Sequence, residues 1–126
     1  MNRFVLIAVG AILGANARYL VGLWAGARFG AGFPVGTLIV NVTGSCALGF
    51  LLAAATGRLN ISPELRLFLG VGFLGAYTTF SSYAVESLTL IENSSLWKAL
   101  INIFANNFVG LASALLGIYL ARLVGG

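Results

Sequence analysis

Residues 70–86 read GVGFLGAYTTFSSYAVE. The first part of this segment is apolar with three glycines, and the second part places a run of hydroxyl residues in the middle of a long apolar stretch. Such a pattern predicts a membrane-spanning helix that breaks near mid-membrane. A break at that depth is tolerated only where protein buries the freed backbone groups or a cavity solvates them.

Four stretches of the 126-residue chain, this one included, are apolar and long enough to cross a bilayer. Mean hydropathy is +1.00 and only 8% of residues are charged, which a soluble domain of this size could not sustain. About 20 helical residues cross a hydrocarbon core of roughly 30 Å. The expected spans are residues 4–24, 35–56, 67–91 and 96–123. The sequence therefore predicts an all-α membrane protein, a single transmembrane domain over residues 1–126 with a break in its third helix.

The residue inventory excludes several classes of function. The chain has no His and no Asp, and its single cysteine, Cys46, lies inside the second span. Clustered metal ligands, disulfides and Ser/His/Asp or Cys/His catalysis are thereby excluded, and Glu86 lacks the partners that an enzyme would need. The net charge of +4 is spread over loop ends, which favours anchoring at lipid headgroups over nucleic-acid binding.

The basic residues give the chain a weak orientation signal. With four spans both termini share a side, and the two sides carry Arg3, Arg58, Arg66 and Arg122 against Arg28 and Lys98. A difference this small leaves the orientation weakly fixed. We therefore expect a dual-topology protein that pairs with an inverted copy as an antiparallel homodimer, because four helices enclose little aqueous path alone.

Polar and small residues form stripes at helical spacing. The first span carries Gly10, Gly14, Arg18 and Gly22, the second Thr37, Asn41 and Ser45, and the fourth Asn102, Asn106, Gly110, Ser113 and Gly117. The glycines are typical of close helix packing. Arg18 at depth either snorkels or has a partner. Asn41 either makes an interhelical hydrogen bond or lines a pore, and two neutral stripes suggest a narrow track of donors.

The break itself offers two kinds of site. The first half-helix ends in carbonyls that favour a small cation such as Na+, particularly if two inverted copies meet there. Phe80 and Tyr83 share a face just beyond the break, either as packing residues or with ring edges toward an anion. Glu86, one turn further on, either lies near a vestibule or pairs with Arg18.

Three motifs resemble the Fluc (CrcB) fluoride channels of microbes: GANARY at 14–19, GTLIVNVTG at 36–44 and GFLGAYTTFS at 72–81. The resemblance covers the whole chain in length, span count and motif order. It implies a fluoride-selective channel that exports fluoride passively across the cell (inner) membrane. It further implies a dual-topology homodimer with two antiparallel pores and a central structural Na+ at the dimer interface.

The resemblance also implies roles for individual residues. The Na+ would be held by main-chain carbonyls of Gly75 and Thr78, and a vestibule would be shaped by Arg18 and Glu86. The pore would be lined by Asn41, Phe80, Tyr83, Thr79, Ser81, Asn106 and Ser113. One departure stands out, because Tyr83 occupies a position where the family usually has Phe, so its hydroxyl either donates to the ion or turns the ring elsewhere.

Two other classes compete with the channel. A proton-coupled exporter of the small multidrug resistance kind is also a four-helix dimer, but it needs an acid in its binding chamber, usually in the first helix, where this chain has Arg18 and no acid. A structural or assembly subunit would use every stripe for packing, and it would not need a break beside paired aromatic residues.

Overall fold

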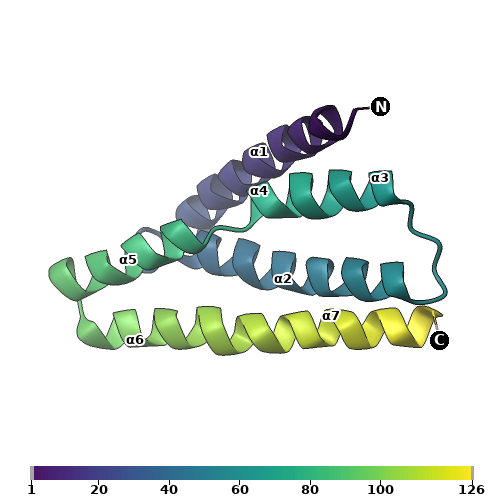
Figure 1. Ribbon diagram of the computed structural model, residues 1–126. Helices are drawn as coiled ribbons and strands as arrows, with labels where there is room; N and C mark the ends of the chain where they lie inside the picture. The colour runs from purple at the N-terminus through teal and green to yellow at the C-terminus, as the bar shows by residue number, and fades with distance from the viewer. Residues whose placement is uncertain (1, 126) are drawn as a thin grey trace.

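The computed structural model describes residues 2–125, and over that range it is helical with short connections. The helices are arranged as rods, one of which is interrupted (Figure 1). Three rods are long and apolar enough to cross a membrane: α1 (Arg3–Phe29), α2 (Val35–Thr56), and a continuous rod of α6 (Leu96–Phe104), η2 (Ala105–Val109) and α7 (Gly110–Gly125). The interrupted rod comprises α3 (Pro63–Arg66), η1 (Leu67–Leu74), α4 (Gly75–Tyr77) and α5 (Phe80–Asn93). The predicted all-α architecture, with four helices and a broken third, is confirmed.

The break falls at two threonines. Thr78 (φ −82°, ψ 156°) and Thr79 (φ −151°, ψ 107°) are both extended, between the end of α4 and the start of α5. The Thr79 hydroxyl accepts a hydrogen bond from the Ser82 N–H at 3.1 Å and so caps the second half-helix. The glycines that helped to predict the break lie before it, mostly in the π-helical segment η1. Among them, Gly72 has a clear packing role, because a Cβ there would lie 2.8 Å from the Ile7 carbonyl oxygen of α1.

Small residues let the rods approach closely at two interfaces. On α1, a Cβ at Gly10 or Gly14 would overlap the backbone of Phe68 or Phe73 in η1. Between α2 and α7, a Cβ at Gly117 would overlap the Cys46 backbone. The predicted packing role of the glycine stripe is therefore confirmed at Gly10 and Gly14, and without a Cβ at these positions the backbones come into direct contact.

Capping residues set the ends of the rods. Ser62 caps α3 by accepting from the Leu65 N–H at 3.1 Å, with Pro63 in the first turn, so the third rod begins before the predicted residue 67. Gly30, at φ 80°, ends α1 five residues beyond the predicted 24. The described ends of the chain, near Asn2 and Gly125, lie at the same end of the bundle as the α2–α3 connection (Figure 1).

The side chains are arranged as in a protein that lipid solvates. Large apolar residues are exposed on every rod, for example Phe4, Leu52, Val71 and Leu111. By contrast, Ser87, Asn102 and Ser113 are buried. Polar groups in a membrane protein gather inside, where they can pair with one another. The buried polar residues therefore mark hydrogen-bonded contacts between the rods.

Candidate functional site

A hollow of ≈ 240 Å³, lined by polar residues and by an aromatic pair, lies beside the helix break. It is lined by α2, by the break and the start of α5, and by η2: Asn41, Gly44, Ser45, Leu48, Thr78, Thr79, Phe80, Tyr83, Asn106 and Asn107. Five of the residues predicted to line a pore therefore meet at one place, although they come from three different spans. These five are Asn41, Thr79, Phe80, Tyr83 and Asn106.

Asn41 connects the second span to the break. Its Oδ1 accepts from the Thr79 N–H at 2.8 Å, and its Nδ2 donates to the Thr79 carbonyl at 3.1 Å. In an uninterrupted helix the Thr79 N–H would bond to the Gly75 carbonyl. The Asn41 amide takes over that role, so the interhelical hydrogen bond that the sequence left open is present, and the same residue lines the hollow.

A chain of neutral hydrogen bonds continues from Asn41 through the fourth rod. Asn41 donates to the Asn106 side-chain oxygen at 3.0 Å, and Asn106 donates to the Asn102 side-chain oxygen at 3.0 Å. Asn102, which is fully buried, donates to the Ser87 hydroxyl at 2.9 Å, and Ser87 donates to the Tyr83 carbonyl at 2.8 Å. The network joins three spans and contains no formal charge, as the sequence predicts for the two stripes.

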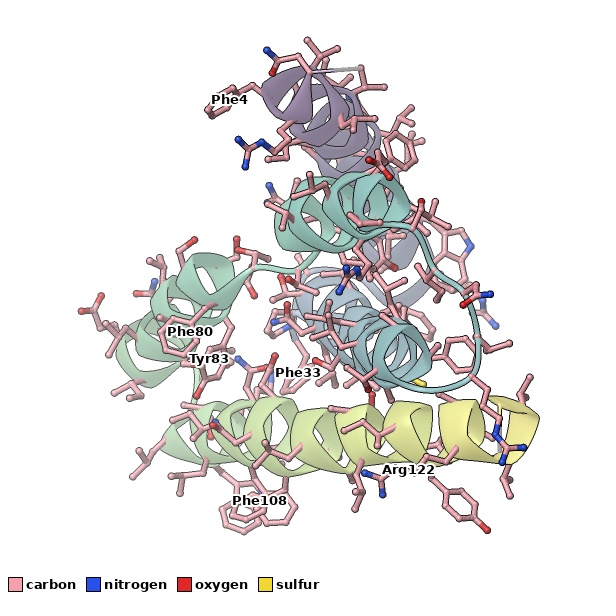
Figure 2. The ribbon with its side chains drawn as sticks, turned by 45° about the vertical axis from the view of Figure 1, so that its right-hand side comes forward. Phe4, Phe33, Phe80, Tyr83, Phe108 and Arg122 are labelled. Atoms are coloured by element: carbon pink, nitrogen blue, oxygen red, sulfur yellow. The ribbon has the colours of Figure 1, made fainter. Side chains whose placement is uncertain are left out.

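Phe80 and Tyr83 form the aromatic wall of the hollow. Their ring centroids lie 5.3 Å apart with an interplanar angle of 66°, an edge-to-face contact. Figure 2 shows both rings on the side of α5 that faces the α6–η2–α7 rod. The Phe80 side chain is 77% exposed, so α5 holds it at the surface of the single chain instead of in a core.

Two predicted pore residues lie elsewhere. The Ser113 hydroxyl donates to the Val42 carbonyl and so joins α7 to α2, away from the residues that line the hollow. Ser81 is exposed at the start of α5, with its hydroxyl 3.3 Å from that of Thr79. The structure thus brings Ser81 to the edge of the break but places Ser113 in a helix interface.

Arg18 and Glu86 have different partners. The Arg18 Nε donates to the Ala76 carbonyl at 3.0 Å, and Glu86 Oε1 accepts from the Thr37 hydroxyl at 2.8 Å. Within residues 2–125 the second carboxylate oxygen of Glu86 is buried without a hydrogen-bond partner. The sequence left a pairing of Arg18 with Glu86 open, and these contacts assign each residue another partner.

Both residues nevertheless line neighbouring hollows. Arg18 lines one of ≈ 430 Å³ that also includes Thr79, and Glu86 lines one of ≈ 360 Å³. The two hollows share Gly22, Gly36 and Thr37. The guanidinium thus serves as a hydrogen-bond donor to the end of the first half-helix while it borders a cavity.

At the break, main-chain carbonyls are the groups that could hold a small hard cation. Because the Thr79 N–H turns to Asn41, the Gly75 carbonyl loses its helical donor, and the Thr78 carbonyl lies in extended backbone. Within the described chain no three His, Cys, Asp or Glu side chains come together. A cation at this place would therefore depend on main-chain oxygens, and the carboxyl end of a half-helix is favourable for positive charge.

Several residues of the site follow from spacing that the sequence already contains. Ser87 lies one turn after Tyr83, and Thr37 lies one turn before Asn41, so each extends a known polar face. The contact of Asn107 with Tyr83 at 2.9 Å and that of Arg18 with Ala76 depend on tertiary packing. No periodicity in the sequence indicates them.

Comparison with known proteins places the chain in a family. The family described as "CrcB-like protein, Camphor Resistance (CrcB)" matches residues 5–118. A protein of Trichormus variabilis named "Fluoride-specific ion channel FluC" is 47% identical over 122 residues, which cover 96% of this chain and 89% of that protein. Proteins with the same name from Roseiflexus sp. and Chloroflexus aurantiacus are 47% identical over 120 residues and 42% identical over 127 residues. These matches cover 95% and 100% of this chain, and 97% and 100% of the relatives. The chain belongs to the CrcB family.

Proposed function

We propose that this protein is a fluoride-selective channel that exports fluoride passively and thereby lowers its cytoplasmic concentration. The observation that carries the proposal is the convergence of neutral polar side chains and an aromatic pair in one hollow at a helix break, with Asn41 from the second span and Phe80 from the third. The relatives named as fluoride-specific channels support the same activity.

The chemistry of the hollow suits fluoride. Fluoride is small, strongly hydrated and a strong hydrogen-bond acceptor, so removing its water requires closely spaced donors. A high density of donors would select fluoride over larger anions. Because the donors are neutral, binding would remain weak enough for the ion to leave. The positive ring edges of Phe80 and Tyr83 add attraction for an anion without adding charge.

The membrane potential supplies the driving force. An inside-negative potential of 100 mV is worth about 2.3 kcal/mol for each charge. That free energy corresponds to a gradient of roughly fifty-fold. A passive channel in the cell (inner) membrane therefore exports fluoride without a coupled ion.

The proposal includes an antiparallel homodimer with two pores and a central structural Na+. The small difference in basic residues between the two ends supports insertion in both orientations. The carbonyls of Gly75 and Thr78 would hold the ion where two inverted copies meet, and its charge would stabilise the ends of the first half-helices. Exposed Phe80 and the other apolar side chains offer surface for a partner or lipid.

The decisive experiment is a flux assay. The purified protein is reconstituted into liposomes loaded with fluoride, the potential is clamped with a potassium ionophore, and released fluoride is followed with a selective electrode. Chloride-loaded liposomes run in parallel. Rapid release of fluoride without chloride supports the channel, and release of neither ion from a folded dimer refutes it.

The alternative function, a proton-coupled exporter, has no support in the structure. Such an exporter needs an acidic side chain in its binding chamber, whereas α1 carries no acid and its Arg18 binds a backbone carbonyl.

Dual topology is tested by labelling from one side. Asn60 is exposed in the connection between α2 and α3, and a single cysteine can be placed there after Cys46 is replaced by Ala. In sealed cells, an impermeant maleimide should label about half of the Asn60→Cys chains if both orientations occur. Labelling of all chains, or of none until the membrane is permeabilised, would establish one orientation and refute this part of the proposal.

A further inference from the structure

We propose that the Tyr83 hydroxyl donates a hydrogen bond to the anion in the hollow, and that Asn107 is the residue that orients this hydroxyl. The inference rests on the proposed fluoride channel and assigns Tyr83 a donor in addition to a ring edge. Both residues line the hollow beside the break, Tyr83 from α5 and Asn107 from η2.

The orientation of the Asn107 amide follows from its contacts. Its Nδ2 lies 2.8 Å from the Ile103 carbonyl oxygen and 2.9 Å from the Tyr83 hydroxyl oxygen. A carbonyl oxygen can only accept, so the group that faces Ile103 must be the NH2 group. The same NH2 group faces Tyr83, and since it has no acceptor capacity, the Tyr83 oxygen must be the acceptor of this hydrogen bond.

Because the Tyr83 oxygen accepts from Asn107, the phenolic proton of Tyr83 remains available to another acceptor. A tyrosine hydroxyl has one proton to donate as well as lone pairs to accept with. Asn107 engages a lone pair, and among residues 2–125 this is the one hydrogen bond that the Tyr83 hydroxyl makes. Its proton is therefore unused by protein and directed away from Asn107, in a side chain that borders the hollow.

The π-helical segment η2 explains how two consecutive residues serve one site. Asn106 donates to Asn102 and accepts from Asn41, whereas Asn107 donates to Tyr83. In a regular α-helix neighbouring side chains point in clearly different directions. The local widening of a π-helix, a feature frequent at functional sites, lets both asparagines reach the same hollow.

A hydroxyl donor and a ring edge alone predict different effects of replacing Tyr83 by Phe. If only ring edges matter, Phe at position 83 is equivalent to Tyr. If the hydroxyl donates, its removal weakens anion binding by about tenfold, the effect of losing one hydrogen bond to a charged group. Removing Asn107 then matters only as long as the hydroxyl is present.

The test is a double-mutant cycle on the reconstituted protein. The wild type, Tyr83→Phe, Asn107→Ala and the double variant are compared for the fluoride concentration that gives half-maximal flux and for maximal flux. We expect Tyr83→Phe to raise the half-maximal concentration about tenfold. Asn107→Ala should raise it as well, and the double variant should equal Tyr83→Phe alone. Tyr119→Phe, which removes a hydroxyl from an exposed residue of α7, is the matched control and should change nothing.

Two outcomes would overturn the inference. An unchanged half-maximal concentration in Tyr83→Phe removes the hydroxyl from the site, and an Asn107→Ala effect that persists in the Tyr83→Phe background shows that Asn107 does not act through it. Both leave the proposed channel intact, because the wild-type flux tests that separately. If Asn107→Ala does not reconstitute as a folded dimer, a fluoride-minus-chloride difference spectrum in the tyrosine near-ultraviolet decides. It should be lost in Tyr83→Phe and kept in Tyr119→Phe, and its retention in Tyr83→Phe refutes the donor.

Discussion

The side chain of Asn41 binds both backbone groups of Thr79, accepting from its N–H at 2.8 Å and donating to its carbonyl at 3.1 Å. Thr79 is the second of the two extended residues at which the third span breaks. One amide on α2 thus replaces a lost helical hydrogen bond and fixes where the second half-helix begins. The stability of the break and the polarity of the hollow depend on the same residue.

Replacing Asn41 should therefore lower the stability of the protein and stop conduction through the hollow. In Asn41→Ala the Thr79 N–H and carbonyl are left unsatisfied inside the protein, at a cost of about 1–3 kcal/mol for each group. We expect a lower melting temperature of the purified protein and loss of fluoride flux. Asn16→Ala is the matched control, because within residues 2–125 the Asn16 amide donates only to Ile12 of its own helix. Equal melting temperatures for the two variants would contradict the bridging role.

The Asn41→Asp variant adds a negative charge while it keeps one of the two hydrogen bonds to Thr79. The carboxylate can still accept from the Thr79 N–H, but it cannot donate to the Thr79 carbonyl or to Asn106. It also places negative charge beside the path of an anion. We expect flux to stop at a pH where the aspartate is ionised, and retained flux under that condition would place Asn41 outside the pore.

Phe80 gives the sharpest test of the aromatic wall. Phe80→Ile keeps an apolar side chain but removes the ring edge, so flux should fall by about tenfold or more while the protein remains folded. Phe108→Ile is the control, since Phe108 projects from the opposite side of the α6–η2–α7 rod (Figure 2). Size-exclusion chromatography checks the fold and the liposome assay measures flux. Normal conduction by Phe80→Ile would refute the ring-edge mechanism.

Much of this fold is readable from the sequence because lipid imposes simple rules. Span length and apolar composition predicted four helices, and the run of hydroxyl residues after Gly75 predicted a break that occurs at Thr78 and Thr79. Helical spacing predicted that Asn41 and Asn106 belong to polar faces. Each of these signals is local, with a period that one helix determines.

The contacts of Ser113, Arg18 and Glu86 could not be predicted in this way, because they depend on how the rods pack. Spacing placed Ser113 on the same stripe as Asn106, but Asn106 lies within the π-helical segment η2 and Ser113 in the α-helix that follows it, so the regular spacing is lost. Ser113 bonds to the Val42 carbonyl instead of lining the hollow. Likewise, Arg18 and Glu86 are opposite charges at depth, a pattern that suggests an ion pair. Their partners, Ala76 and Thr37, become apparent only when the broken helix is positioned against α1 and α2.

Arg18 should prove to be a structural donor. Its Nε bonds to the Ala76 carbonyl, the group that Phe80 would satisfy in an unbroken helix. Arg18→Ala should lower stability by about 1.5–3 kcal/mol, the range for a hydrogen bond to a charged group. Arg18→Lys should recover only part of the lost stability, because lysine keeps the charge but lacks the planar Nε–H group. Arg28→Ala, at the exposed end of α1, is the control, and a melting temperature of Arg18→Ala equal to that of the control would refute the assignment.

Two glycines of the fourth rod should respond to alanine in opposite ways. A Cβ at Gly117 would overlap the Cys46 backbone, so Gly117→Ala should force α7 away from α2 and lower the melting temperature. A Cβ at Gly110 meets nothing within 4 Å, so Gly110→Ala should be neutral or stabilising by about 0.4–1 kcal/mol. Similar effects of the two substitutions would contradict the close packing of α2 on α7.

Removal of Na+ tests the proposed cation site without altering a side chain. Main-chain carbonyls at Gly75 and Thr78 cannot be deleted, but the ion can be withheld by purifying and reconstituting the protein with a large organic cation in place of Na+. If the ion stabilises the ends of the first half-helices, the sodium-free protein should melt at a lower temperature and conduct less fluoride, and returning Na+ should restore both. The Gly110→Ala protein should show the same dependence, since that residue lies outside the break. Identical melting and flux with and without Na+ would remove the cation from the proposal and leave the hydrogen bonds from Asn41 and Arg18 as the groups that hold the break.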